Sequence, residues 1–370
     1  MDTIRFGFIG LGGMARAHWN NLRRFSGVQL AAVCDTNGES VNRFGDDASI
    51  PPKKRYTDYR KLIADPDVNA VVCITPNDTH AAIIRACLEA GKPFMAEKPF
   101  TRTFEEAVEL MKLYQTKPVV NMIGFSYRYL PQFRYAKQLV ESGVLGAVRH
   151  ISIQYLQGWG SAITNQPMVW RFDKAVAGTG ALGDLGSHMI DMARFLAGEF
   201  EEVSGRLATF VHERPDPSSG RMVPVEVDDF AAFHALLRPN IPGPDIPAVF
   251  QTSRNAVGSG NQHEAAIFGD RGTLHVSSEN RDSVTVLLHK PGSGAVEREE
   301  WKVPGDLGLD QWDEFLKVLR GGHSDLITTV VDGYLNQAVL EAVVVSDRER
   351  RHVKLSEFPD VRTWLPKTEG

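Results

Sequence analysis

The first third of the chain alternates short apolar runs with longer amphipathic segments. Two of the longer segments, His80–Ala90 and Phe104–Tyr114, repeat apolar residues every three or four positions, which is the period of a helix. The short runs are rich in β-branched residues, as buried strands are: Ile4–Ile9, Val28–Cys34, Asn69–Thr75, Pro93–Ala96 and Pro118–Ile123. Because parallel strands need crossover connections, this alternation predicts a doubly wound α/β domain with a parallel sheet over residues 1–123.

The pattern changes after this region. A helix is predicted over Gln132–Glu141, a strand over Val148–Leu156, and further helices over Leu185–Leu196 and Val330–Val345. Other runs with strand character are separated by turn residues and not by helices: Ala231–Leu237, Val249–Thr252, Glu264–Phe268, Thr273–Val276 and Val284–Leu288. Strands joined by turns form antiparallel sheets, so residues 124–370 are predicted to form an α+β domain with a large, mostly antiparallel sheet.

Charge and composition narrow the class of function. The 41 Lys and Arg residues against 46 Asp and Glu give a net charge of −5, which argues against nucleic acid or an anionic membrane as the main partner. No apolar run approaches the roughly 18 residues of a membrane span, and no export signal precedes the first predicted strand. The isolated cysteines, Cys34, Cys73 and Cys87, are expected to be buried free thiols. We therefore expect a cytoplasmic protein.

A glycine-rich segment, Gly10-Leu11-Gly12-Gly13-Met14-Ala15, links the first predicted strand to a helix and fits the pattern G-x-G-x-x-G/A. The first glycine allows a tight turn, and the second lets the backbone approach a pyrophosphate at the positive end of the helix. Asp35 ends the next strand, where its carboxylate would accept hydrogen bonds from ribose hydroxyls and repel a 2′-phosphate. Gly10, Gly12, Gly13, Met14 and Asp35 are thus predicted to bind a dinucleotide, with NAD favoured over NADP.

Three further motifs follow in order: Ile74-Thr75-Pro76-Asn77-Asp78-Thr79-His80, Ala96-Glu97-Lys98-Pro99 and Gly183-Asp184-Leu185-Gly186-Ser187-His188-Met189-Ile190-Asp191. Together with the glycine loop they resemble the glucose–fructose oxidoreductase/inositol dehydrogenase (Gfo/Idh/MocA) family over essentially the whole chain. The resemblance implies a Rossmann domain followed by a domain whose open sheet often mediates oligomers, here a homodimer or homotetramer. It also implies NAD(P)-linked oxidation or reduction at a carbon of a sugar, inositol or related polyol.

The resemblance also assigns residues. Lys98 matches the catalytic lysine of the family, and Asp184 and His188 match its substrate-binding and catalytic pair. Thr75, Pro76, Asn77 and His80 are expected on the cofactor side, together with Lys98 itself. Glu97 either contacts the cofactor or pairs locally.

The residues support the lysine independently of the resemblance. Lys98 follows a buried parallel strand, and open α/β sheets form their ligand crevice at the carboxyl ends of such strands. Pro99 fixes the backbone after it, in the cis or the trans form.

Asp184, His188 and Asp191 are spaced i, i+4 and i+7, so on a regular helix they would share one face. Their neighbours are mostly apolar, so the helix is expected to be buried and its polar groups to be hydrogen-bonded. The alternatives are a helix-capping Asp184 with a core His188, or a metal site, which lacks a third ligand with matching spacing. We predict no metal.

The proposed chemistry places His188 as the base and Lys98 as the cation that stabilises a developing alkoxide. Lys98 could instead take the proton, because an oxidised nicotinamide beside it would lower its pKa. Aromatic faces and an arginine suit a polyhydroxylated ring, so the predicted substrate residues also include Tyr127, Arg128, Trp159, Trp170 and Arg171. Each tryptophan could equally pack at a hinge or interface, and His263 is a further candidate.

Two other functions use the same residues differently. One is a glycosidase that oxidises its substrate only transiently with bound NAD. The other is a non-catalytic NAD- or sugar-binding regulator, which would not need Lys98 and His188. The main prediction requires the Lys98 ammonium and the His188 imidazole to meet beside the nicotinamide ring.

Overall fold

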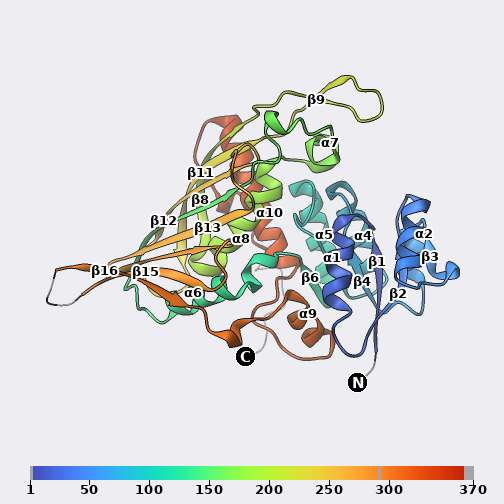
Figure 1. Cartoon of the computed structure of the whole chain (residues 1–370), viewed down its shortest axis with the longest axis horizontal. Coiled ribbons are helices and arrows are strands. Elements are labelled where there is room, and N and C mark those ends of the chain that lie inside the picture. Colours follow the sequence, from blue (N-terminus) through green and yellow to red (C-terminus); the bar gives the residue numbers. More distant parts are fainter. Residues whose placement is uncertain (1–2, 291, 293, 362–370) are drawn as a thin grey trace. The chain divides into compact units, whose positions relative to one another are not determined.

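The computed structural model describes residues 3–290, 292 and 294–361 (Figure 1). The chain forms two compact units. The first comprises the described residues up to Gly124 together with Gln311–Tyr334 and Val361, and the second comprises Phe125–Asp310 and Leu335–Asp360. Residues 311–334, which the sequence-based division assigned to the second domain, thus belong to the first unit. Residues 362–370 of that predicted domain lie outside the described residues.

The first unit contains a six-stranded parallel sheet in the order β3-β2-β1-β4-β5-β6. Its strands are β1 (Ile4–Ile9), β2 (Val28–Cys34), β3 (Arg55–Tyr56), β4 (Ala70–Cys73), β5 (Phe94–Ala96) and β6 (Asn121–Ile123). Its helices are α1 (Gly13–Leu22), α2 (Gly38–Asp47), α3 (Tyr59–Ala64), α4 (Asn77–Glu89), α5 (Phe104–Thr116) and α9 (Gln311–Leu319). The predicted doubly wound α/β domain is confirmed.

Alternating side chains of β1 pack against different helices. Phe6 lies edge-on to Trp312 of α9, with ring centroids 5.9 Å apart. Phe8 meets Trp19 of α1 in the same way at 6.4 Å. Gly7 points to the other face, where a Cβ atom would come within 2.5 Å of Leu62 in α3. The packing of α9 on β1 is the physical reason that this late segment belongs to the first unit.

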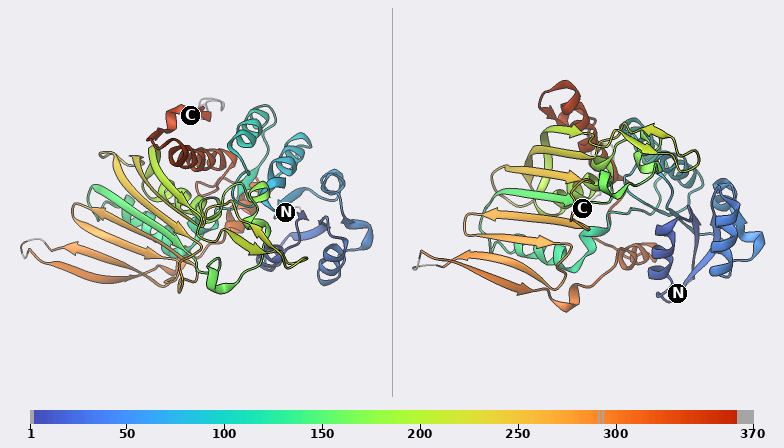
Figure 2. Two further views of the ribbon diagram at one scale, coloured as in Figure 1. Left: turned by 90° about the horizontal axis from the view of Figure 1, so that it is seen from above. Right: turned by 45° about the horizontal axis from the view of Figure 1, so that its top comes forward.

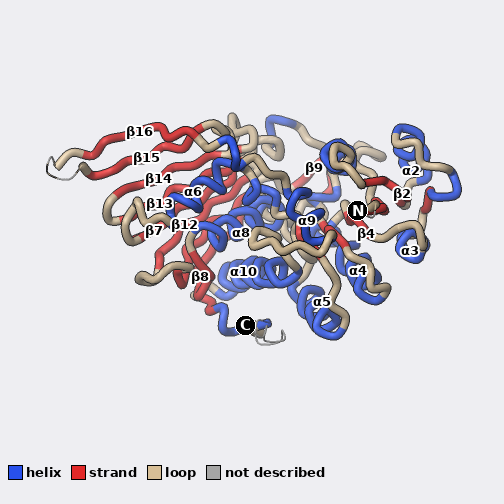
Figure 3. The backbone as a smooth tube through the Cα atoms, turned by 90° about the horizontal axis from the view of Figure 1, so that it is seen from below, coloured by secondary structure: helices blue, strands red, loops and turns tan. Residues whose placement is uncertain are grey.

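The second unit is built on a nine-stranded sheet in the order β16-β15-β14-β13-β7-β12-β11-β8-β17, whose strands run side by side in Figure 3. The strands are β7 (Val148–Leu156), β8 (Gly198–Ala208), β11 (Phe230–Pro239), β12 (Ile246–Ser253), β13 (Gln262–Gly269), β14 (Gly272–Ser277), β15 (Ser283–His289), β16 (Val296–Lys302) and β17 (Val353–Lys354). β12 and β7 pair in parallel, and the other neighbours are antiparallel, which confirms the predicted mostly antiparallel sheet.

Three strands of this sheet were not predicted: β8, β16 and the two-residue β17. β16 has the sequence VEREEWK and is exposed along nearly its whole length, so it carries no apolar alternation. It lies at the sheet edge, where charged residues prevent further strand pairing. β8 begins Gly-Glu-Phe-Glu-Glu, and the glutamates on both sides of Phe200 weaken its apolar signal. A separate hairpin of β9 (Glu213–Pro215) and β10 (Met222–Pro224) also escaped prediction.

Helices cover one face of the nine-stranded sheet. These are α6 (Pro131–Glu141), α8 (Ser187–Leu196) and the part of α10 (Val330–Glu349) that follows Leu335 (Figures 2 and 3). A short helix, α7 (Lys174–Ala177), precedes the segment that leads into α8. None of the helices in the described residues is long and apolar enough to cross a membrane. The three cysteines are buried and free, as predicted.

Candidate active site

The glycine loop leaves β1 by a turn that requires glycine at its first position. Gly10 has a φ of +90°, and a Cβ atom there would lie 2.5 Å from the carbonyl oxygen of Ile74. Asp35, at the end of β2, accepts hydrogen bonds from the backbone N–H of Leu11 at 2.8 Å and of Asn37 at 2.9 Å. These bonds hold the partly exposed carboxylate of Asp35 beside the loop.

The loop has the space that a dinucleotide phosphate needs. A Cβ atom built at Gly12 or Gly13 would meet nothing within 4 Å, and both residues are exposed at the N-terminus of α1. The first N–H groups of a helix have no partner within the helix, and they carry its positive partial charge. Met14, half exposed in the same turn, flanks this space. Glycine loop, helix terminus and Asp35 therefore fit NAD.

The motif after β4 opens α4 but does not offer all its side chains to a ligand. Thr75, Pro76 and Asp78 are partly exposed, whereas Asn77 is buried. The His80 ring is 1% exposed; its Nδ1 lies 2.9 Å from the carbonyl oxygen of Pro99 and its Nε2 lies 3.0 Å from that of Thr75. Burial lowers the pKa of His80.

His80 was predicted among the residues on the cofactor side. Each ring nitrogen instead lies within hydrogen-bond distance of a backbone carbonyl, and the neutral ring donates to one of them, so the side chain links the end of β4 to the segment after Lys98. His80 therefore stabilises the backbone on both sides of Lys98 and is not itself placed to contact the cofactor.

Glu97 pairs locally, which was one of its two predicted alternatives. Its Oε1 lies 2.9 Å from Nε2 of His18 in α1, and its Oε2 accepts the backbone N–H of Lys98 at 3.3 Å. Burial alone would raise the pKa of Glu97, but the hydrogen bond with His18 and the charge of Lys98 outweigh burial and lower it. Lys98 itself follows β5 at the carboxyl edge of the parallel sheet and is partly exposed.

In the second unit, Asp184 does not lie on a regular α-helix. Residues Leu182–Gly186 form one π-helical turn before α8, a feature that is frequent at functional sites. Asp184 accepts a hydrogen bond from Nη2 of Arg254 at 3.1 Å, and Nε of Arg171 lies 3.8 Å from the same oxygen. The buried Asp228 caps the start of this segment by accepting the N–H groups of Gly180 and Leu182. The carboxylate of Asp184 is thus held between two arginines.

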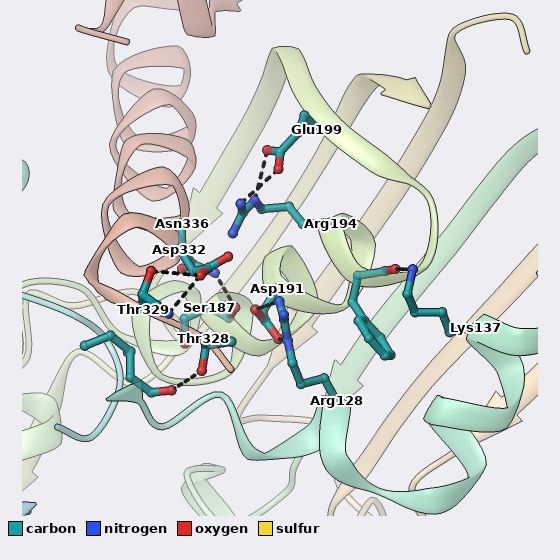
Figure 4. Close-up of polar contacts among 12 residues, drawn as sticks. Arg128, Lys137, Ser187, Asp191, Arg194, Glu199, Thr328, Thr329, Asp332 and Asn336 are labelled. Atoms are coloured by element: carbon teal, nitrogen blue, oxygen red, sulfur yellow. Dashed lines mark hydrogen bonds and ion pairs between the residues drawn. The ribbon is translucent and has the colours of Figure 1, made fainter. Parts of the chain in front are cut away.

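His188 follows in α8 and lies among aromatic rings. Its ring is 6% exposed and meets Tyr127 edge-on, with the centroids 4.8 Å apart. Phe125 and Tyr155 lie 6.4 and 6.0 Å from it by the same measure. The backbone carbonyl of the preceding residue, Ser187, accepts a hydrogen bond from Asn336 of α10 at 2.7 Å (Figure 4).

Arg128 was predicted to contact substrate, but it forms a buried ion pair with Asp191, whose carboxylate was expected to be hydrogen-bonded. Figure 4 shows the two side chains facing each other: Nε of Arg128 lies 3.0 Å from Oδ2 of Asp191, and Nη2 bonds Oδ1. Arg128, predicted to contact substrate, is only 7% exposed and its guanidinium lies over the Phe195 ring. Because the backbone turns through a 3-10 helix at Ser126–Tyr129, Arg128 points into the interior while Tyr127 stays partly exposed.

The loop after β7 places its aromatic residues in two ways. Trp159 packs on Phe172, with ring centroids 5.2 Å apart, and donates its indole N–H to Oε1 of Gln157 at 2.6 Å. Trp170 lies under the guanidinium of Arg171, whose carbon is 4.4 Å from the ring centroid. Four side chains of this loop are partly exposed: Gln157, Trp159, Trp170 and Arg171.

His263 is a core residue of the second unit. Its ring is 0% exposed and stacks on Tyr155 with the centroids 5.0 Å apart. Burial lowers the pKa of His263 to about 3, so the ring is neutral at physiological pH. This residue, open in the sequence analysis, supports the aromatic cluster around Tyr127 and Tyr155.

Sequence reasoning missed four residues that the fold brings to this region: Tyr155, Gln157, Arg254 and Asn261. Tyr155 is next to the last residue of β7 and Gln157 directly follows the strand, Arg254 follows β12, and Asn261 precedes β13. A weak signal was available, since all four lie at the ends of predicted strands, but only strand pairing shows that these ends meet. No group of three or more His, Cys, Asp or Glu side chains in the described part of the chain is arranged to hold a metal ion.

Comparison with known proteins gives matches over both units. Residues 4–125 match the family model described as oxidoreductase family, NAD-binding Rossmann fold, and residues 133–275 match the GFO/IDH/MocA C-terminal domain. Levoglucosan dehydrogenase of Pseudarthrobacter phenanthrenivorans is 32% identical over 97% of this chain and 100% of its own length. Myo-inositol 2-dehydrogenase of Thermotoga maritima is 26% identical over 96% of this chain and 99% of its own. A solved structure of levoglucosan dehydrogenase with NADH and L-sorbose superposes with a TM-score of 0.84 at 30% identity, covering 96% of this chain and 99% of that one.

Proposed function

The chain belongs to the Gfo/Idh/MocA family of NAD-binding oxidoreductases, and from this premise we propose that it transfers a hydride between nicotinamide and a secondary alcohol or carbonyl carbon of a sugar, inositol or related polyol. The observation that carries the proposal is the set of polar side chains that share the second unit with His188. A base of suitable type lies beside Tyr127, and the hydroxyl, amide and carboxylate groups of Tyr127, Gln157, Asn261 and Asp184 belong to the same unit. Such groups recognise the hydroxyls of a polyol.

We assign the cofactor side to the first unit. Backbone N–H groups at Gly12 and Gly13 would bind the diphosphate, with Gly10 shaping the turn and Met14 beside it. Asp35 would bind the adenosine ribose, and Thr75 and Pro76, with the backbone of Asn77 at the start of α4, would contact the cofactor between Asp35 and Lys98. When bound, NAD supplies the nicotinamide carbon that takes up the hydride.

Replacing Asp35 by Ser is expected to weaken NAD binding about tenfold or more and to reduce the preference of the protein for NAD over NADP. The carboxylate supplies charge-assisted hydrogen bonds, typically about 1.5–3 kcal/mol each, and its charge repels a 2′-phosphate. Fluorescence titration with NADH and NADPH measures both affinities. Asp47→Ser is the matched control, since Asp47 is an exposed surface partner of Arg16. Unchanged NADH affinity in Asp35→Ser would contradict the assignment.

On the substrate side, we assign each group a role that its position allows. Asp184, held by Arg254, accepts a hydrogen bond from a substrate hydroxyl. His188 takes the hydroxyl proton of the carbon being oxidised, because a neutral imidazole is a suitable base near pH 7. Lys98 stabilises the developing alkoxide or, as the alternative, takes the proton. Trp159, Trp170 and Arg171 border the polyol.

An absorbance assay for NADH over levoglucosan, myo-inositol, glucose and L-sorbitol tests the proposal. Oxidation of at least one compound with net NADH formation is expected. Release of sugar from a glycoside without net NADH would instead identify the redox-assisted glycosidase. Binding of NADH and sugar with no turnover of either kind would identify a regulator.

The cellular setting and assembly belong to the same proposal. We place the protein in the cytoplasm, which suits its three free thiols.

We propose a homodimer or homotetramer through the sheet face opposite α6 and α8, where His150 stacks on Phe268 with ring centroids 4.2 Å apart. Light scattering is expected to give two or four times the chain mass, and Phe268→Arg to reduce it. A monomer in the unmodified protein would contradict this.

A further inference from the structure

Four side chains, two of which are in ring contact with His188, form a connected hydrogen-bond network. The hydroxyl oxygens of Tyr127 and Tyr155 lie 2.6 Å apart, and the Tyr155 oxygen lies 2.5 Å from Oδ1 of Asn261. Nδ2 of Asn261 lies 2.7 Å from the Tyr127 oxygen, which closes a ring of three contacts. Nε2 of Gln157 lies 2.7 Å from Oδ1 of Asn261 and 3.3 Å from the Tyr155 oxygen.

A tryptophan outside the ring sets the orientation of both amides. The indole N–H of Trp159 can only donate, so the Gln157 atom 2.6 Å from it must be the carbonyl oxygen. The amide nitrogen of Gln157 then faces Asn261, whose nearer atom must be its oxygen. It follows that the Asn261 nitrogen faces Tyr127 and donates to it.

The positions of the two phenolic protons follow from the same counting. The contact between Tyr155 and Oδ1 of Asn261 needs a proton, and the amide oxygen has none, so Tyr155 donates there. The contact between the two phenols then needs the proton of Tyr127. Each phenol has a single proton, so the hydroxyl of Tyr127 has none left for another partner. It has already accepted one hydrogen bond, from Asn261, and keeps one acceptor position.

Both phenols retain these protons over the working pH range. Burial raises the pKa of Tyr155 and of Tyr127 above the ordinary value for tyrosine. Neither hydroxyl is therefore expected to ionise and reverse the direction of the network near neutral pH. Tyr127 is the only one of the two that is partly exposed, and its ring touches that of His188.

We propose that Tyr127 meets the substrate solely as a hydrogen-bond acceptor, and that the site therefore selects a ligand with a hydroxyl proton to donate at that position. The proposal rests on the proposed function, in which a polyol lies beside His188. It concerns a hydroxyl that is not being oxidised. Tyr155, Asn261 and Trp159 are then specificity-determining residues, because they dictate what Tyr127 can accept.

This arrangement distinguishes three versions of one substrate. A hydroxyl both donates and accepts, a fluorine substituent can only accept weakly, and a deoxy carbon does neither. Against an acceptor-only phenol, the fluoro and deoxy analogues are expected to lose the same amount, about 10–100-fold in kcat/KM, because each leaves the Tyr127 lone pair without a donor. Against a phenol that can donate, the fluoro analogue would retain part of that activity.

The substrate experiment uses whichever of levoglucosan and myo-inositol gives the higher kcat/KM, with its monodeoxy and monodeoxyfluoro series. At one non-reacting position, the unmodified protein is expected to give the same kcat/KM for the deoxy and the fluoro analogue. Tyr155→Phe removes the acceptor of the Tyr127 proton, so the fluoro analogue is expected to become at least threefold better than the deoxy analogue. Tyr135→Phe, on α6 and outside the network, is the matched control and should behave like the unmodified protein. A fluoro analogue that the unmodified protein accepts as well as the parent compound would overturn the proposal.

A second measurement needs neither turnover nor a variant that folds. Neutron diffraction from deuterated crystals of the protein with NADH is expected to place the Tyr127 deuteron towards Tyr155 and the Tyr155 deuteron towards Asn261. A Tyr127 deuteron directed away from Tyr155 would overturn the proposal. If the deuterons lie as expected and no compound of the panel is oxidised, the proposed function fails and the acceptor-only state of Tyr127 stands.

Discussion

Replacing Lys98 by Met is expected to reduce turnover at least a hundredfold while NADH still binds. Met has a similar length and apolar stem but no charge, so the substitution removes the ammonium group with little change in volume. A fixed cation beside a developing alkoxide stabilises the transition state more than the ground state, and removal of one such group commonly costs about 10²–10³-fold in turnover. Steady-state absorbance at the NADH band and NADH titration measure the two quantities separately.

The position of Lys98 makes the result interpretable. Lys98 lies after β5 and its neighbour Glu97 is tied to His18, so the strand end does not depend on the Lys98 side chain for its anchoring. Lys112→Met, on the exposed side of α5, carries the same substitution away from the site and should leave turnover unchanged. Urea unfolding of both variants checks that the fold is retained. Near-normal turnover in Lys98→Met would remove this residue from the mechanism.

Replacing His188 by Ala is expected to reduce turnover about 10²–10⁴-fold, because a positioned base contributes that much to the rate. The ring is buried against Tyr127, so its removal also leaves space in which a small base can bind. Added imidazole is therefore expected to restore part of the turnover. His323→Ala, at an exposed histidine after α9, is the matched control.

The same variant separates the two assignments of the base. If His188 takes the proton, its loss should abolish the fall in kcat/KM on the acid side of the pH profile, and imidazole should rescue the enzyme. If Lys98 takes the proton, His188→Ala should keep the shape of the pH profile and show no response to imidazole. If His188→Ala turns over nearly as fast as the unmodified protein, His188 has no part in the reaction.

The first unit was largely readable from its sequence. β1 and β2 have the predicted bounds because buried parallel strands are short, mostly apolar and bordered by turn residues. The glycine loop was recognisable because a tight turn at the first glycine and a close approach at the second need residues without a side chain. The position of Lys98 followed from the rule that ligand sites lie at the carboxyl ends of parallel strands.

The second unit was readable in outline only. Its alternating runs predicted an antiparallel sheet, but β16 was missed because a solvated edge strand has no apolar face to detect. The shared face expected for Asp184 and Asp191 assumed a regular helix. The π-helical turn at Leu182–Gly186 breaks that spacing, and the two carboxylates bind different arginines.

The sequence by itself determined the alternation of strands and helices, the dinucleotide loop and the residue types that the proposed chemistry needs, since all of these are local patterns along the chain. Tertiary structure alone decided which polar groups are already occupied. Arg128 meets Asp191, His80 meets the carbonyl of Pro99, and Trp159 directs the protons of Tyr155 and Asn261 through Gln157. A hydrogen bond depends on the distance and direction between two atoms, and for partners far apart in the chain these exist only once the strands have paired.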